Sequence, residues 1–170
     1  AFDAALVAML IPGRPVLLKW TRDDEHAWEP YGSAMVCELR GSLDSGGRIV
    51  DWSHESHGDT FIMGRPAPGR TGSPASKLLS SAFRAVPLEK TPPQPALSPH
   101  AGIHRNLAPL YDLPNPRLIK HLVRDLPLRT SALRTLGAFA NVTAIESFMD
   151  QLAETAGIPA LEFRLQHLTD

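Results

Sequence analysis

The chain has 170 residues, with 17 basic and 18 acidic side chains, a formal net charge of −1 and an isoelectric point near 6.7. This length suits one domain with its own core, and the balanced charge argues against nucleic acid or an anionic membrane as the main partner. Cys37 is the single cysteine, which excludes an intramolecular disulfide and a metal site built from several thiolates.

The first part of the sequence predicts a helix end, a strand and a charged helix start. Residues 1–10 are mostly apolar and are typical of the last turns of a helix, but the apolar stretch is too short for a secretory signal or a membrane span. Residues 16–21 are predicted to form a buried strand. Residues 23–25 are Asp-Asp-Glu, and a charged helix start explains them more simply than a metal site does.

A hairpin is predicted next, with strands at residues 34–40 and 48–56 joined by the turn-rich sequence Asp-Ser-Gly-Gly at residues 44–47. Hydropathy alternates along both strands, so one face of the sheet can be buried. On the first strand Met35, Cys37 and Leu39 alternate with Val36, Glu38 and Arg40, and on the second Val50, Trp52 and His54 alternate with Ile49, Asp51 and Ser53.

Residues 64–116 carry eleven of the sixteen prolines, with a candidate short helix at residues 76–85. We interpret this stretch as a long loop that either wraps a neighbouring surface or is a flexible, dispensable insert. Residues 117–124 predict a further strand. Strands flanked by helices, without repeated strand-helix alternation, predict an α+β fold with a mainly antiparallel sheet and packed helices.

Two helices are predicted at the C-terminal end. Apolar residues at three- and four-residue spacing indicate an amphipathic helix over residues 142–156, with Asn141 as its N-cap and Gly157 and Pro159 as its stop. A second, short helix carries Leu161, Leu165 and Leu168 on one side and Glu162, Gln166 and His167 elsewhere. The pair is expected to cap the core and has no basic face for DNA.

Residues 132–141 form a loop of small residues that leads onto the N-terminus of the first of these helices. Gly137 can adopt backbone angles that a side chain forbids, and Ala138 and Ala140 keep neighbouring side chains short. Free amides and the helix dipole favour an anion at such a place. A tight connection between strand and helix, without any ligand, is the alternative.

Several separated blocks of the chain carry a family resemblance. They are residues 13–16 and 20–25, 29–32, 47–50, 105–115, 128–137, 144–152 and 161–165. These blocks resemble the molybdopterin-binding subunit of the xanthine dehydrogenase and aldehyde oxidase family, and within it the isoquinoline oxidoreductase type of beta subunit. They agree in their order along nearly the whole chain, which makes the resemblance more specific than one short motif.

The resemblance implies that the chain is part of a molybdenum-cofactor-binding domain. Enzymes of this family hydroxylate aldehydes or nitrogen heterocycles with oxygen from water and pass the electrons to iron-sulfur centres. In such enzymes the cofactor carries the chemistry and the protein positions it. The expected cofactor-binding residues are Leu133, Arg134, Leu136 and Gly137, since Arg134 matches the arginine of the family's Phe-Arg-Gly-Phe-Gly pattern.

The chain departs from that pattern at several positions. Thr135 replaces the usual glycine, and Leu133 and Leu136 stand where aromatic residues are common, so stacking on a flat substrate is not expected from these two positions. Tyr31 and Gly32 lie in the region of the arginine that recognises purines. Purines are therefore not the expected substrate.

The family's earlier glycine-rich Phe-Gly segment and its late Gly-Glu motif, which bears the catalytic base, are not found in the sequence. We therefore expect residues 1–170 to form a single partial domain with no catalytic residue of its own, no turnover in isolation and no cofactor bound to the isolated chain. The expected partners are the remainder of the molybdenum subunit, an iron-sulfur subunit and a small aldehyde or heterocycle, with no nucleic acid. The intact enzyme is expected to be cytoplasmic or exported and membrane-associated.

A noncatalytic scaffold derived from the same fold, with the proline-rich arm binding another protein, is the alternative hypothesis. The histidines do not predict a metal site. His54 and His57 are three residues apart on a predicted strand, which puts them on opposite faces, and His100 and His104 could chelate only if their loop ordered around an ion. No nucleophile-elbow pattern supports a hydrolase.

Overall fold

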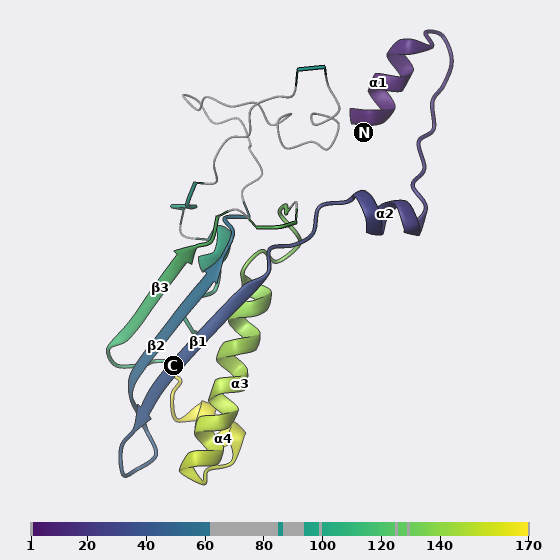
Figure 1. Ribbon diagram of the computed structural model, residues 1–170. Helices are drawn as coiled ribbons and strands as arrows, with labels where there is room; N and C mark the ends of the chain where they lie inside the picture. The colour runs from purple at the N-terminus through teal and green to yellow at the C-terminus, as the bar shows by residue number, and fades with distance from the viewer. Residues whose placement is uncertain are drawn as a thin grey trace.

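The computed structural model describes residues 2–61, 85–86, 94–98, 100–124, 126–128 and 130–169. Most of the first half of the proline-rich stretch, with nearly all of the candidate helix at residues 76–85, lies outside these ranges. The elements, in chain order, are α1 (Phe2–Leu10), α2 (Arg22–Trp28), β1 (Met35–Leu43), β2 (Ile49–Gly58), the 3-10 helix η3 (Gly102–His104), β3 (Pro116–Leu122), α3 (Ala138–Ala156) and α4 (Ala160–Leu165) (Figure 1).

The three strands form one sheet in the order β1-β2-β3. The hairpin is confirmed, because β1 and β2 pair antiparallel with Cys37 opposite Ser56. The third strand is also confirmed, and it runs parallel to β2 with His57 opposite His121. Helices and a sheet whose longer ladder is antiparallel make the fold α+β, as the sequence predicted.

A bulge near the hairpin turn changes which side chains of β2 point inward. The register slips between Ser42 and Leu43, so that Ile49 pairs with Leu43 and Val50 is the extra residue. Ile49 is 2% exposed and Val50 is 41% exposed. The prediction that Val50 shares the buried face of Trp52 and His54 is therefore wrong, because simple alternation fails where one residue is inserted.

The core lies between the inner face of the sheet and helices α3 and α4 (Figure 1). Trp52 of β2 is fully buried and its ring lies 5.3 Å from that of Phe148 on α3. Burying a large apolar side chain contributes about 1.5 to 3 kcal/mol to folding. The buried members of this cluster are Ile49, Trp52, Leu113, Ile145, Met149, Leu152, Ala153 and Phe163.

The short helix α4 is held to the core by residues other than the predicted leucines. Leu161, Leu165 and Leu168 are about half exposed or more, whereas Phe163 is completely buried. His167 follows α4 and is also buried; its Nδ1 lies 2.7 Å from the carbonyl of Phe163, and its Nε2 accepts from the amide of Ile49 at 3.0 Å. The imidazole therefore connects the end of the chain to the start of β2.

Helix α3 begins at Ala138, four residues before the predicted start, and ends as predicted at Gly157, whose φ of 68° is left-handed. Asn141 is thus inside the helix, and its prediction as N-cap is wrong. The side chain is fully buried, accepts from Ser56 Oγ at 2.6 Å and donates to the carbonyls of Ile103 and Arg105 at 2.7 and 3.0 Å. Because these partners use the amide, it does not cap the helix and instead joins α3, β2 and η3.

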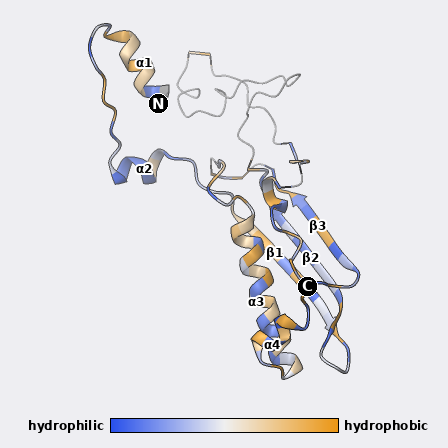
Figure 2. Cartoon of the chain, turned by 180° about the vertical axis from the view of Figure 1, so that it is seen from behind, coloured by the Kyte–Doolittle hydropathy of each residue, from blue (hydrophilic) through white to orange (hydrophobic). Residues whose placement is uncertain are grey.

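Residues 2–30, here called the N-terminal arm, lie apart from the sheet (Figures 1 and 2). Residues 16–21 form no strand, contrary to the prediction, and Leu17 is 91% exposed. The charged helix start is confirmed, since Thr21 caps α2 in a capping box with Asp24. Helix α1 is apolar yet largely exposed (Figure 2), and none of the helices in the described ranges combines the length and hydropathy of a membrane span.

Candidate functional site

The loop before α3 starts near Thr130, where the chain lies beside the segment that leads into β1. Tyr31 and Thr130 form an isolated parallel bridge, and the amide of Ser131 donates to the carbonyl of Tyr31 at 2.9 Å. The hydroxyl of Thr130 donates to Asp59 Oδ2 at 2.6 Å. These contacts fix the start of the loop against two segments that are distant in sequence.

The tightest part of the loop is at Thr135 and Leu136, whose φ angles are 79° and 54°. Side chains other than glycine are disfavoured in this left-handed region by about 1 to 2 kcal/mol per residue. Two backbone bonds hold the turn, from the amide of Leu136 to Leu133 and from the amide of Ala138 to Thr135. The glycine that the resembling family has at the position of Thr135 therefore matches the backbone conformation found here.

Gly137 differs from the sequence-based prediction. Its φ is −67°, which any residue can adopt, so the expected special backbone angles are absent at this position. Glycine is required at position 137 for steric reasons, because a Cβ there would lie 2.5 Å from the carbonyl oxygen of Ile103. The amide of Gly137 is also occupied, since it donates to the carbonyl of Gly102 at 3.2 Å. This residue thus packs the loop against η3.

A cavity of about 370 Å³ lies on the other side of the loop. Three of the four expected cofactor-binding residues, Leu133, Arg134 and Leu136, line it, and Gly137 does not. The described residues that line it are Gly32, Ser33, Met35, Phe61, Leu133, Arg134, Thr135, Leu136, Phe139 and Ala140. Its volume is within the range of small-molecule sites, roughly 300 to 1,000 Å³.

The described residues that line the cavity are mostly apolar, and Arg134 is the one cationic side chain among them. Arg134 is exposed, and within the described ranges its guanidinium makes no hydrogen bond or ion pair. A guanidinium is charged at any physiological pH and pairs well with carboxylate or phosphate. The N-terminus of the 19-residue helix α3 follows the loop directly and adds a favourable field for an anion. The site therefore suits a ligand with an apolar part and an anionic group.

Two aromatic residues of this cavity were not identified from the sequence. Phe61 is 7% exposed with a φ of 56°, and Phe139 is 75% exposed in the first turn of α3. They provide ring surfaces in the same cavity as Leu133 and Leu136, two positions from which no stacking was expected. Phe61 follows the end of β2 by three residues, and only the tertiary fold brings it to the loop.

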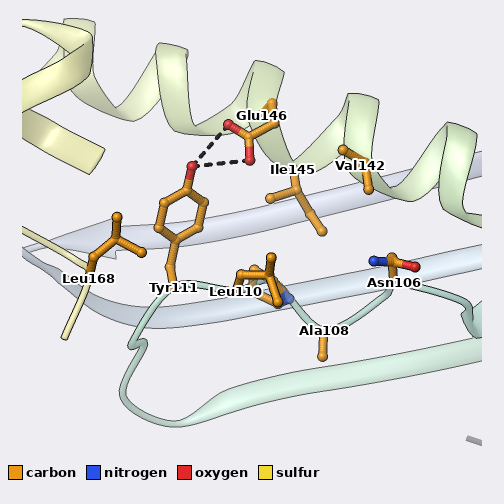
Figure 3. A pocket seen from close by; sticks show the side chains of 9 residues that line it. Asn106, Ala108, Leu110, Tyr111, Val142, Ile145, Glu146 and Leu168 are labelled. Carbon is orange, nitrogen blue, oxygen red and sulfur yellow. Dashed lines mark hydrogen bonds between the residues drawn. The ribbon is translucent and has the colours of Figure 1, made fainter. Parts of the chain in front are cut away.

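A second cavity, of about 230 Å³, lies between α3 and the segment before β3 (Figure 3). Tyr111 donates its hydroxyl to the carboxylate of Glu146 at 3.0 Å, and Arg164 Nε donates to the same carboxylate at 3.0 Å. Burial and the neighbouring carboxylate raise the pKa of Tyr111. The contacts among Tyr111, Glu146 and Arg164 connect α3, α4 and the segment at residues 106–111. Their role is therefore structural.

The histidine predictions have mixed outcomes. His54 and His57 lie on opposite faces of β2, as expected: His54 is fully buried, and burial lowers its pKa. His104 bonds to the carbonyl of Ser98 at 2.7 Å and to Lys120 Nζ at 3.1 Å, so its two nitrogens are engaged. A cluster of Glu55, His57 and His121 on the outer face of the sheet was not predicted from the sequence.

No protein-family model matches the chain. The chain is 32% identical over 168 residues to a subunit of nicotinate dehydrogenase from Pseudomonas putida, an alignment that covers 99% of this chain and 12% of the relative. This similarity supports the oxidoreductase family indicated by the sequence resemblance and does not distinguish the isoquinoline oxidoreductase subtype. The chain spans about one eighth of the length of the relative that it matches.

Proposed function

We propose that this chain is part of the cofactor-binding subunit of a molybdenum hydroxylase, and that residues 133–136 contribute to holding a molybdopterin. The proposal is supported by the similarity to the nicotinate dehydrogenase subunit along the whole chain. It is also supported by the loop, where Arg134, without an ion-pair partner among the described residues, lines a partly apolar cavity. When bound, the molybdenum cofactor would supply the transfer of oxygen from water to the substrate and accept the electrons.

The residues present fit one portion of such a cofactor. The guanidinium of Arg134 would pair with an anionic oxygen, while Leu133, Leu136 and Phe139 would exclude water from the adjoining apolar part. Gly137 would act indirectly, since its missing side chain allows the loop to approach residues 102–103. This chain would thus bind and orient, and the proton-accepting carboxylate of the reaction would come from another part of the protein.

The favoured substrate class is a nitrogen heterocycle that bears a carboxylate, because the relative belongs to a nicotinate dehydrogenase. An aldehyde, the isoquinoline oxidoreductase subtype, an iron-sulfur partner subunit and a cytoplasmic or exported, membrane-associated enzyme remain predictions. The exposed apolar residues of α1, such as Met9 and Leu10 at 79% and 80% exposure, are consistent with packing against the remainder of a larger subunit.

The test is to purify the complete product of the reading frame that encodes this segment, together with any iron-sulfur protein encoded beside it. Bound molybdenum, extractable pterin and oxidation of nicotinate with an artificial electron acceptor are then measured. Stoichiometric molybdenum with heterocycle oxidation is expected. A purified product without molybdenum or pterin would contradict the proposal and favour the noncatalytic scaffold, which would instead retain a protein partner.

A further inference from the structure

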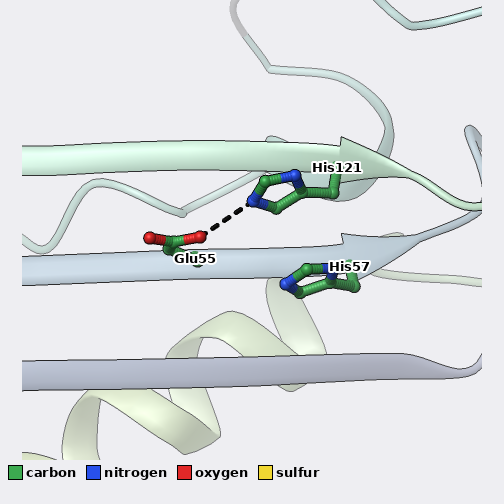
Figure 4. Close-up of side chains that lie close together, drawn as sticks. All are labelled: Glu55, His57 and His121. Atoms are coloured by element: carbon green, nitrogen blue, oxygen red, sulfur yellow. Dashed lines mark hydrogen bonds and ion pairs between the residues drawn. The ribbon is translucent and has the colours of Figure 1, made fainter.

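Three potential metal ligands meet on the outer face of the sheet, opposite the face that packs against helix α3. Glu55 and His57 lie two residues apart on β2, and His121 lies opposite His57 on the parallel strand β3 (Figure 4). One ligand atom from each of the three lies within 4.8 Å of the others. We propose that Glu55, His57 and His121 bind one divalent transition-metal ion of the zinc type.

The position of the cluster follows from strand alternation. His54 and Ser56 point inward, toward the helix layer, so Glu55 and His57 must point outward. Their side chains are 27% and 33% exposed, and that of His121 is 41% exposed. An ion could therefore reach the site from solvent without any opening of the core.

The donors are already close to a coordinating arrangement. His121 Nε2 lies 2.9 Å from Glu55 Oε2, and the two imidazole rings stack with centroids 4.1 Å apart and planes 11° apart. Ligand bonds of about 2.0 to 2.1 Å in a tetrahedral zinc site put donor atoms about 3.4 Å from one another. The β2-β3 ladder holds the three backbones side by side, so the change from the present separations to that spacing would fall on the side chains.

The ligand types decide the class of ion. Two imidazoles and one carboxylate suit zinc and its neighbours in the first transition row, whereas magnesium and calcium prefer oxygen donors. Glu38 adds a second carboxylate, with its Oε1 4.0 Å from His57 Nε2. Arg117 forms an ion pair with Glu55 in the absence of an ion, and it would have to turn away when the metal binds.

Hydrogen bonds from Arg117 and His121 lower the pKa of Glu55, and a metal ion would have to displace both of these donors from the carboxylate. A stacked histidine pair beside a carboxylate, with no metal, is the competing explanation of the same geometry, and direct binding measurements separate the two.

The experiment is isothermal titration calorimetry of the 170-residue chain with ZnCl₂ at pH 7.5, with CoCl₂ absorption spectra to report the ligand geometry. One Zn²⁺ per chain is expected, with no heat from MgCl₂. The His121→Ala and Glu55→Gln variants should each bind at least tenfold more weakly. His26→Ala, a change of an exposed histidine in α2, should bind as the unchanged chain does.

A melting curve for each variant verifies that the surface substitutions leave the fold intact, and a chemical-shift map with Zn²⁺ locates the ion directly even if one variant fails to fold. Shifts confined to residues 55–57 and 119–121 would support the site. Binding that is equally strong in His121→Ala and the unchanged chain, or shifts centred on His100 or His26, would overturn it.

Discussion

Apolar side chains are buried in the sheet and helices α3 and α4, here called the body of the molecule, but are largely exposed in the N-terminal arm. In the body, Trp52 of β2, Met149 of α3 and Phe163 of α4 have zero exposure. In the arm, Met9, Leu10 and Leu17 are 79% to 91% exposed. Hydropathy produces a core only where two elements present apolar faces to each other, and helix α1 has no such partner within the described ranges (Figure 1).

This difference has consequences for stability. Unfolding of the body exposes a contiguous core, so substitutions there should be costly, whereas equivalent substitutions in the arm should have little effect on the same transition. Under the proposed function the arm would gain its partner from the rest of a larger subunit, and its exposed apolar side chains would then become buried.

The largest effect is expected for Phe163→Ala. The phenyl ring is fully buried in the core cluster, and its loss leaves a cavity, which costs about 3 to 5 kcal/mol. Leu10→Ala in the arm should change the free energy of unfolding by less than about 0.5 kcal/mol. Urea denaturation followed by circular dichroism measures both free energies of unfolding. A similar loss of stability in the two variants would contradict the difference between the body and the arm.

A somewhat smaller effect is expected for Asn141→Leu, which keeps the volume of the side chain. The change removes both donors, which leaves the buried carbonyl of Ile103 and the partly buried carbonyl of Arg105 without these partners, at about 1 to 3 kcal/mol for a buried group and less for a partly buried one. A total loss of about 2 to 4 kcal/mol is expected by urea denaturation. Gln151→Leu on the exposed side of α3 is the control, and an equal cost for it would contradict a structural role of the buried amide.

Two glycines allow the regions to be compared at equal local geometry. Gly157 ends α3 with a φ of 68°, Gly13 follows α1 with a φ of 78°, and at both positions a Cβ would meet open space. Gly157→Ala should cost about 1 to 2 kcal/mol because the body holds that conformation. Gly13→Ala should cost almost nothing in the same thermal melt, since the arm can change its angles without disturbing the core; equal costs would indicate that the arm is part of the cooperative unit.

The smallest effect is expected at the loop and has the opposite sign. Thr135→Gly relieves a left-handed φ of 79°, and after the added entropy of the unfolded chain it should stabilise the protein by roughly 0.5 to 1 kcal/mol. Differential scanning calorimetry measures the change in Tm. A lower Tm would mean that Thr135 contributes contacts that outweigh the strained backbone angle.

Local signals in the sequence were sufficient for some elements and insufficient for others. The hairpin follows from alternation and the turn at residues 44–47, and the end of α3 follows from Gly157. The inward position of Ile49 was missed because one inserted residue reverses alternation. Residues 16–21 were predicted as a strand because they are apolar, but a strand needs a partner for its backbone, which no local pattern supplies.

The candidate site was predictable only in part, for the same reason. The resemblance to a known family pointed to residues 133–137, but it could not indicate that the amide of Gly137 is used by Gly102 or that Phe61 approaches the loop. The cluster on the outer face depends on the parallel pairing of β2 with β3, which places His121 opposite His57 across 64 residues of sequence. Only the register of the sheet reveals such a group.

The central claim is that Arg134 and its loop help to hold an anionic metal cofactor. The most direct test is the molybdenum content of the complete protein carrying Arg134→Gln, compared with Arg124→Gln, a change of another exposed arginine outside the cavity lining. We predict that Arg134→Gln lowers the molybdenum bound per protein at least threefold with an unchanged Tm of the metal-free form, while Arg124→Gln does not. Equal molybdenum in both variants would contradict the account.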